Sequence, residues 1–165
     1  MSYREYSPHP ALSNYIDAYW TINTEKIDQP KLHRILPDGC TDIIFNRGNT
    51  IYRPDQRIAL LSEESYLIGT MTTFSETMRS SGNSVLGIRF KPGAITAFYH
   101  LDASEFTDLG VPYKDKFLRD LIYSSTNLRN DLNFYFLKKL PSQPTTVAAV
   151  LVDEVRSLNL LKNML

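Results

Sequence analysis

Charged residues inside two apolar runs are the side chains of this sequence best placed to do chemistry. Asp42 lies in the run 41–46, and Arg89 lies in the run 85–90. Because successive side chains of a strand alternate between its two faces, each of these charges shares a face with apolar or small neighbours. If both strands line a barrel, we expect Asp42, Arg89 and also Arg34 to point inward. An inward charge must be paired or must meet a ligand.

Such a cluster is suited to orienting a small polar effector. Trp20 is a further candidate for the wall of the same pocket. The predicted ligand-binding residues are therefore Arg34, Asp42, Arg89 and Trp20. Two other interpretations stay open: these charges lie on a solvated outer face, or they form a fixed internal ion pair that holds the neighbouring corner of the chain.

That corner is the segment 36–39, which reads Leu-Pro-Asp-Gly and is typical of a tight turn. Proline presets φ, aspartate can bond the following backbone, and glycine accepts a positive φ. Cys40 follows the turn and is the only cysteine, which excludes a disulfide framework and a thiolate metal cluster. We predict an unreactive thiol, because neighbouring acidic residues raise the pKa of a cysteine.

The sequence offers little to a metal or to a nucleophilic enzyme. The histidines, His9, His33 and His100, are far apart, and none has a partner at strand spacing. We therefore predict no metal site and no cofactor. A Gly-x-Ser-x-Gly elbow and a glycine-rich phosphate loop are also missing from the sequence. These observations favour a protein that is not an enzyme.

The balance of charge removes the usual indication of nucleic-acid binding. The 165 residues include 18 basic and 18 acidic side chains, so the formal net charge is zero. A domain that wraps nucleic acid usually carries a basic surplus. The first residues form no apolar signal segment, and no apolar run reaches membrane-spanning length. We expect one cytoplasmic domain, or one domain with an appendage, and no membrane contact.

Short runs of strand-forming residues fill the first ninety residues. The predicted strands lie near 18–24, 32–36, 41–46, 50–53, 58–61, 66–71, 74–79 and 84–90. The segments 46–49 and 80–83 carry residues typical of hairpin turns. This series predicts a small barrel or sandwich.

Helical periodicity replaces the strand pattern after Gly93. The spacing predicts helices near 94–101, 113–123 and 128–140, and a last helix that begins near Thr146. The apolar stripes of the last two helices serve either the core or a partner. The residues expected at a dimer interface are Leu128, Leu132, Tyr135, Val147, Leu151 and Leu158. Strands followed by helices predict an α+β fold.

Motifs in four places, taken in their order, carry a family resemblance. They are Tyr6-Ser-Pro8 with Tyr19-Trp20, the stretch 34–45 with Pro-Asp-Gly-Cys, Leu67-Ile-Gly69, and the stretch 86–94 with Phe-x-Pro-Gly-Ala. Together they resemble the N-terminal domain of AraC-type bacterial transcription regulators, over about residues 6–101.

This resemblance implies a small cupin-like antiparallel β-barrel over residues 1–101 and a helical extension over 102–144. Residues 145–165 would begin a linker helix. The resemblance also implies that the chain senses a small-molecule effector, forms a homodimer, or does both. In that family, DNA is read by a separate C-terminal domain with two helix-turn-helix motifs, which we expect to be absent from this chain.

Two rival functions belong to other classes. One is a small cupin-type enzyme, such as an isomerase or a metal-dependent oxygenase, which tightly bound metal would indicate. The other is a ligand-free interaction module, which a barrel filled by its own side chains would indicate. The resemblance favours the sensor and dimerisation domain of a transcription factor.

Overall fold

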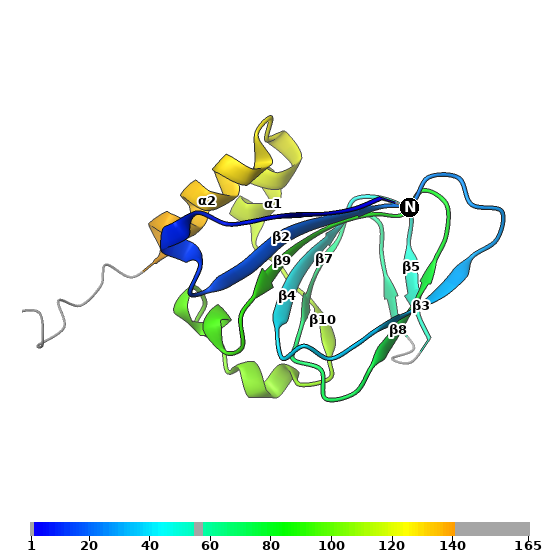
Figure 1. The fold of residues 1–165 in the computed structure, drawn as a ribbon, viewed down its shortest axis with the longest axis horizontal. Coiled ribbons are helices and arrows are strands. Elements are labelled where there is room, and N and C mark those ends of the chain that lie inside the picture. The colour runs from blue at the N-terminus through cyan, green and yellow to red at the C-terminus, as the bar shows by residue number, and fades with distance from the viewer. Residues whose placement is uncertain (1, 55–57, 141–165) are drawn as a thin grey trace, which may run out of the picture.

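The computed structural model describes residues 2–54 and 58–140, in which strands precede two α-helices (Figure 1). The strands are β1 (Ser2–Tyr6), β2 (Ile16–Asn23), β3 (Lys31–Ile35), β4 (Thr41–Asn46), β5 (Ile51–Arg53), β6 (Ile58–Leu60), β7 (Ser65–Ile68), β8 (Ser75–Arg79), β9 (Ser84–Phe90) and β10 (Gly110–Pro112). The helices are α1 (Lys116–Ser124) and α2 (Leu128–Lys139), with short 3-10 helices at η1 (Pro10–Leu12), η2 (Ala94–Ala97) and η3 (Ala103–Phe106). The fold class is α+β, as the sequence predicts.

Within the described residues, the strands form two antiparallel sheets. The larger sheet has the order β1-β2-β9-β4-β7-β10, and the smaller sheet has the order β3-β8-β5-β6. Figure 1 shows β3, β5 and β8 on the side of the molecule away from α1 and α2. The edge strands β1 and β10 have no counterpart among the predicted strands. No described helix is both long enough and apolar enough to cross a membrane.

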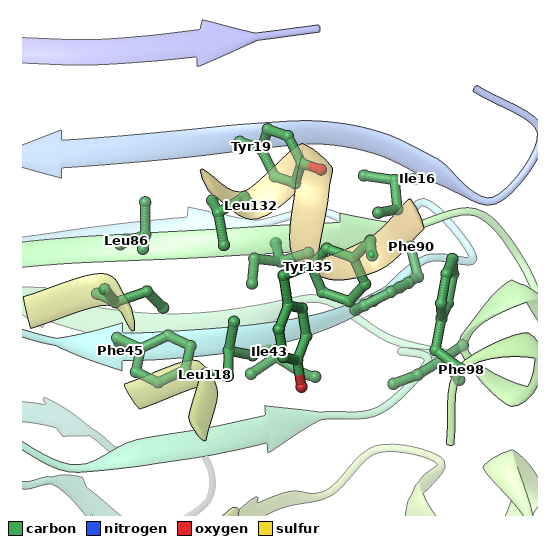
Figure 2. Packing of buried hydrophobic residues seen from close by; sticks show 14 of the residues in the cluster. Ile16, Tyr19, Ile43, Phe45, Leu86, Phe90, Phe98, Leu118, Leu132 and Tyr135 are labelled. Carbon is green, nitrogen blue, oxygen red and sulfur yellow. The ribbon is translucent and has the colours of Figure 1, made fainter. Parts of the chain in front are cut away.

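One face of the larger sheet packs against α1 and α2 and forms the main core (Figure 2). Phe90 of β9 contacts Phe98 and Phe136, with ring centroids 5.7 and 5.6 Å away, and those two rings also contact each other at 5.1 Å. Leu118 of α1 and Leu132 of α2 are fully buried against the same face. Aromatic rings that meet edge to face at such distances add to the stabilisation from burial. The main core thus fixes the larger sheet to the helices.

The opposite face of the larger sheet meets the smaller sheet. A second apolar cluster lies there, formed by Ile44, Ile51, Leu60, Tyr66 and Val85. On β9, the side chains of Leu86, Ile88 and Phe90 enter the main core, whereas Val85 and Arg89 face the smaller sheet. Asp42 pairs with Arg89 across β4 and β9 and shares its face. The alternation predicted for these two strands is therefore confirmed.

The loops 46–49 and 80–83 are not hairpin turns, and that prediction is wrong. β4 and β9 belong to the larger sheet, whereas β5 and β8 belong to the smaller one, so each loop carries the chain between sheets. The two loops bond to each other instead. Asn49 N donates to Gly82 O at 3.0 Å, and Asn83 Nδ2 donates to Asn49 O at 3.2 Å. Turn residues predict a change of direction but do not choose the strand that pairs next.

The helices α1 and α2 lie close to the predicted ranges, but their side chains are used differently. On α1, Phe117 is 73% exposed. Leu132 and Tyr135, expected at a dimer interface, are buried in the core of their own chain, and Leu128 packs partly against it. These three side chains therefore hold α2 to the sheet. The other predicted interface residues, Val147, Leu151 and Leu158, lie outside the described residues.

Candidate functional site

A cavity of about 400 Å³ lies between the two sheets. All the predicted ligand-binding residues, Arg34, Asp42, Arg89 and Trp20, contribute to its lining. The apolar part of the lining comes from both sheets and includes Ile22, Ile44, Ile51, Leu60, Ile68 and Val85. This size and this mixture of apolar walls with a few polar groups are typical of small-molecule sites.

Asp42 and Arg89 form the charged centre of the cavity. Arg89 Nε lies 3.7 Å from Asp42 Oδ1 and 3.7 Å from Asp38 Oδ2. Arg89 Nη1 donates a hydrogen bond to Glu5 Oε1 at 3.3 Å. Arg89 Nε is buried and has no hydrogen-bond partner within the described residues. The guanidinium also hydrogen-bonds with Tyr3, so three carboxylates and one phenol surround it while Nε itself has no acceptor among those residues.

Trp20 forms a flat wall beside this pair. Its Nε1–H donates to Asp42 Oδ1 at 2.7 Å. The indole can lie across β9 because residue 87 is glycine: a Cβ at Gly87 would come within 1.9 Å of Trp20 Cε2. Gly87 is the direct neighbour of Trp20 on β2 and of Ile44 on β4. The glycine thus allows Trp20 on β2 to reach a carboxylate on β4.

Burial and charge shift the pKa values of this centre. Burial raises the pKa of Asp42 to about 6, although the Trp20 hydrogen bond and the charge of Arg89 act against the rise. The Asp42 side chain is only 17% exposed. Burial also disfavours the charge of Arg89, but attraction to Asp42, Tyr3 and Asp38 outweighs it and raises the pKa of the guanidinium. Arg89 stays charged, whereas Asp42 changes its charge near pH 6.

Arg34 lies at the rim of the cavity rather than inside it. Its side chain is 59% exposed and pairs with Glu76 Oε1 at 3.1 Å. Its guanidinium carbon lies 4.1 Å from the centre of the Phe74 ring. On β3, the flanking residues His33 and Ile35 also contribute to the lining. The sequence predicted correctly that β3 borders the cavity. The side chains that β3 turns toward the cavity, however, are those of His33 and Ile35, the neighbours of Arg34.

The smaller sheet contributes charged residues that the sequence interpretation missed. Arg53 of β5 is 1% exposed and donates to the Ser75 hydroxyl. Arg79 of β8 also lines the cavity, and burial lowers its pKa. Burial, with the charges of Arg79 and Lys31, likewise lowers the pKa of His33. Alternation in 51–53 would have placed Arg53 on the face of the apolar Ile51, which is the signal that was available.

The Pro-Asp-Gly corner next to the cavity is confirmed as a structural turn. Cys40 N donates to Asp38 Oδ1 at 2.9 Å, and Gly39 has φ +76°. Burial and the charges of Asp38, Asp17 and Asp42 raise the pKa of the Cys40 thiol to about 11. The thiol is therefore unreactive at neutral pH, as predicted. Among residues 2–54 and 58–140, no group of three or more His, Cys, Asp or Glu side chains is placed to hold a metal ion.

These features define a small α+β domain with a ligand-sized cavity between its sheets. A family model described as a domain of unknown function, DUF6597, matches residues 4–112, which is more than half of the chain. The chain belongs to this family. The matched region runs through β10 and ends before α1. No curated protein and no solved structure matches the chain.

Proposed function

We propose that this chain is the effector-sensing and dimerisation domain of a cytoplasmic bacterial transcription regulator of the AraC type. The observation that carries the proposal is the cavity, because it gathers Trp20, Asp42 and Arg89 between the sheets. The same cavity argues against a ligand-free interaction module, whose interior would be filled by its own side chains. In this proposal the two sheets form a cupin-like barrel, and a separate domain reads DNA.

The strand β9 provides a connection between the cavity and the helices. Arg89 faces the cavity, while the next residue, Phe90, packs on Phe136 of α2 with ring centroids 5.6 Å apart. The Tyr19 hydroxyl of β2 donates to Asn133 Oδ1 of α2 at 3.1 Å. A ligand that displaces β9 or β2 therefore acts on α2 directly. Such a ligand changes the equilibrium only if it binds one arrangement better than the other.

The proposed subunit contact uses the outward side of α1 and α2. Phe117 on α1 and Phe134 on α2 are 73% and 61% exposed. Large exposed aromatic side chains are typical of protein–protein contacts. In this proposal, Phe117 and Phe134 take the place of Leu132 and Tyr135 as contact residues, because Leu132 and Tyr135 are buried in the core of their own chain.

Sedimentation velocity on the 165-residue chain tests the dimer. We expect a dimer that the double substitution Phe117→Ser and Phe134→Ser converts to a monomer. The melting temperature of the monomer itself should fall only slightly, since both side chains are mostly exposed and lose the ring contacts of Phe117 with Tyr135 and of Phe134 with Lys138. Leu61→Ser is the matched control, because Leu61 is exposed but lies outside both helices. A monomeric parent chain, or a double variant that remains dimeric, contradicts the proposed contact.

Sensing is tested with a panel of small acids, bases and neutral molecules. Trp20 is the only tryptophan, so its emission reports on the cavity without a label. We expect at least one compound to change this emission and, at saturation, the dimer dissociation constant. If no compound in the panel changes either quantity, the sensing function is contradicted.

A further inference from the structure

The lining of the cavity carries more positive than negative side chains. Its arginines within the described residues are Arg34, Arg53, Arg79 and Arg89. Its carboxylates within the same residues are Asp38 and Asp42. A cleft lined with an excess of one sign of charge concentrates ligands of the opposite sign. Glu76 and Glu5 pair with Arg34 and Arg89 from outside the lining, so the preference for an anion over a cation rests on the lining itself, in which arginines outnumber carboxylates.

Charged and apolar groups are separated along the inner face of the larger sheet. Asp42 and Arg89 pair at one level of β4 and β9, and Trp20 with Gly87 forms the next inward level. The level beyond places Val85 beside Ile22, where the wall is apolar. Asp38 and Glu5, which contact Arg89, are exposed, so the charged level lies next to solvent. A ligand that matches this order has a charged head and an apolar body.

We propose that the cavity binds an amphipathic organic acid, whose carboxylate is held by Arg89 and whose apolar body lies against the Trp20 indole. This inference rests on the sensing function proposed for the same cavity and names the chemical class of its ligand. A carboxylate matches the fork of donors on a guanidinium and forms stronger bonds with it than a neutral acceptor does.

The hydrogen bonds of Arg89 supply the reason for choosing this residue as the anchor. Its guanidinium hydrogen-bonds with Glu5 and with Tyr3, and its buried Nε has no hydrogen-bond partner within the described residues. A buried donor without an acceptor is unfavourable, and an incoming carboxylate removes that cost. β9 is paired on both sides, by β2 and β4, so the anchor stands on a central strand of the larger sheet.

Three probes that share an apolar phenylalkyl body and differ in the charge of the head group test this inference. They are 4-phenylbutyrate, its amide, and 4-phenylbutylamine. Isothermal titration calorimetry gives the dissociation constants, and Trp20 emission confirms that binding occurs in the cavity. We expect the acid to bind about tenfold or more tightly than the amide, since hydrogen bonds to charged partners are the stronger ones. The amine should bind weakest of the three.

Variants of Arg89 identify the anchor. Arg89→Gln should remove the advantage of the acid over the amide, because it weakens binding of the acid far more than binding of the amide. Arg89→Lys, which keeps the charge but loses the fork, should retain part of that advantage. Arg119→Gln, on α1 and outside the cavity lining, is the matched control and should change neither affinity. If Arg89→Gln fails to fold, the Arg89→Lys comparison decides the question.

The outcomes distinguish the proposed ligand class from the sensing function on which it rests. If the amide or the amine binds as tightly as the acid, the ligand class is overturned, while the sensing function stands. The ligand class is likewise overturned, while the sensing function stands, if the acid keeps its advantage over the amide in both Arg89 variants. If the three probes do not bind, the comparison is repeated with the tightest ligand of the panel and its uncharged analogue. A panel in which nothing binds overturns both proposals.

Discussion

Asp42 occupies a position that disfavours its own charge. Burial raises its pKa from 3.8 to about 6, even with Arg89 and the Trp20 N–H nearby. The folded chain therefore holds this proton more tightly than the unfolded chain does. The resulting contribution to stability is fully present below the unfolded pKa and is lost as the pH rises through the folded pKa. A buried carboxylate kept at the expense of stability, in a cavity, is typical of a binding site.

Asp42→Asn tests this effect directly. The asparagine Oδ1 can still accept from Trp20 Nε1, but the side chain no longer ionises. We expect equal free energies of unfolding at pH 4, and a variant that is more stable by about 1–3 kcal/mol at pH 7.5. Urea titrations at a series of pH values measure the difference, which isolates Asp42 from the other carboxyl groups. A difference between the two proteins that does not grow between pH 4 and pH 7 contradicts the raised pKa.

At the scale of elements, Asn46 fixes the point where the chain leaves the larger sheet. The side chain is fully buried at the end of β4. Its Nδ2 donates to Leu60 O at 2.8 Å and to Asn49 O at 3.0 Å, and its Oδ1 accepts from Gly48 N at 3.2 Å. A single amide thus ties the end of β4 to the end of β6 and to the loop that crosses between the sheets.

Asn46→Asp should strongly destabilise the chain. The carboxylate keeps the acceptor for Gly48 N but faces the carbonyl oxygens of Asn49, Leu60 and Leu61 with no proton to donate. Leaving such buried groups unsatisfied beside a buried charge costs about 3 kcal/mol or more. Chemical denaturation measures the loss. Asn130→Asp is the control, since Asn130 is exposed in the first turn of α2. Similar small losses in both variants would show that Asn46 does not fix the crossing.

The sequence predicted those features that depend on local chemistry. Alternation in 41–46 and 85–90 placed Asp42 and Arg89 on one inner face, and the corner at 36–39 was recognised from its turn residues. Sheet membership was not predictable in the same way, because hydrogen bonding between strands is decided by contacts distant in sequence. The loop 46–49 therefore looked like a hairpin turn although β5 pairs with β6 and β8.

The missed parts of the site have similar physical causes. Arg53 was overlooked because a buried arginine contradicts the usual preference for exposure, and only its partners in the fold make the position tolerable. The edge strands β1 and β10 are supported by single neighbours, β2 and β7, rather than by a strong pattern of their own.

At the scale of the molecule, the strands depend on the helices. The family match ends at residue 112, yet Leu118, Leu132 and Phe136 lie beyond it and are fully buried on the larger sheet. Burial of each such side chain contributes about 1.5–3 kcal/mol. Since the net stability of a domain is about 5–15 kcal/mol, the matched region is not expected to fold without α1 and α2.

Truncation tests this dependence. A chain that ends at residue 114 should melt without a cooperative transition and should bind dyes that recognise exposed apolar surface. A chain that ends at residue 140 retains every residue of the main core and should melt cooperatively. Circular dichroism and differential scanning calorimetry on both chains measure the outcome. A cooperative transition in the shorter chain would show that the strands form an independent folding unit.

The two faces of β9 have a consequence for how this domain can diversify. Side chains that face the helices and side chains that face the cavity come from alternate positions of one strand, and they touch separate sets of neighbours. Substitutions at the cavity positions therefore alter the shape and charge of the cavity while the packing beneath the helices stays unchanged. Insertion or deletion of one residue in β9, in contrast, turns the core-facing side chains toward the cavity and the cavity-facing side chains toward the helices. Such a change disrupts both the core and the cavity. Under the proposed sensing function, family members with different ligands should thus differ by replacement at inward positions and keep the length of this strand.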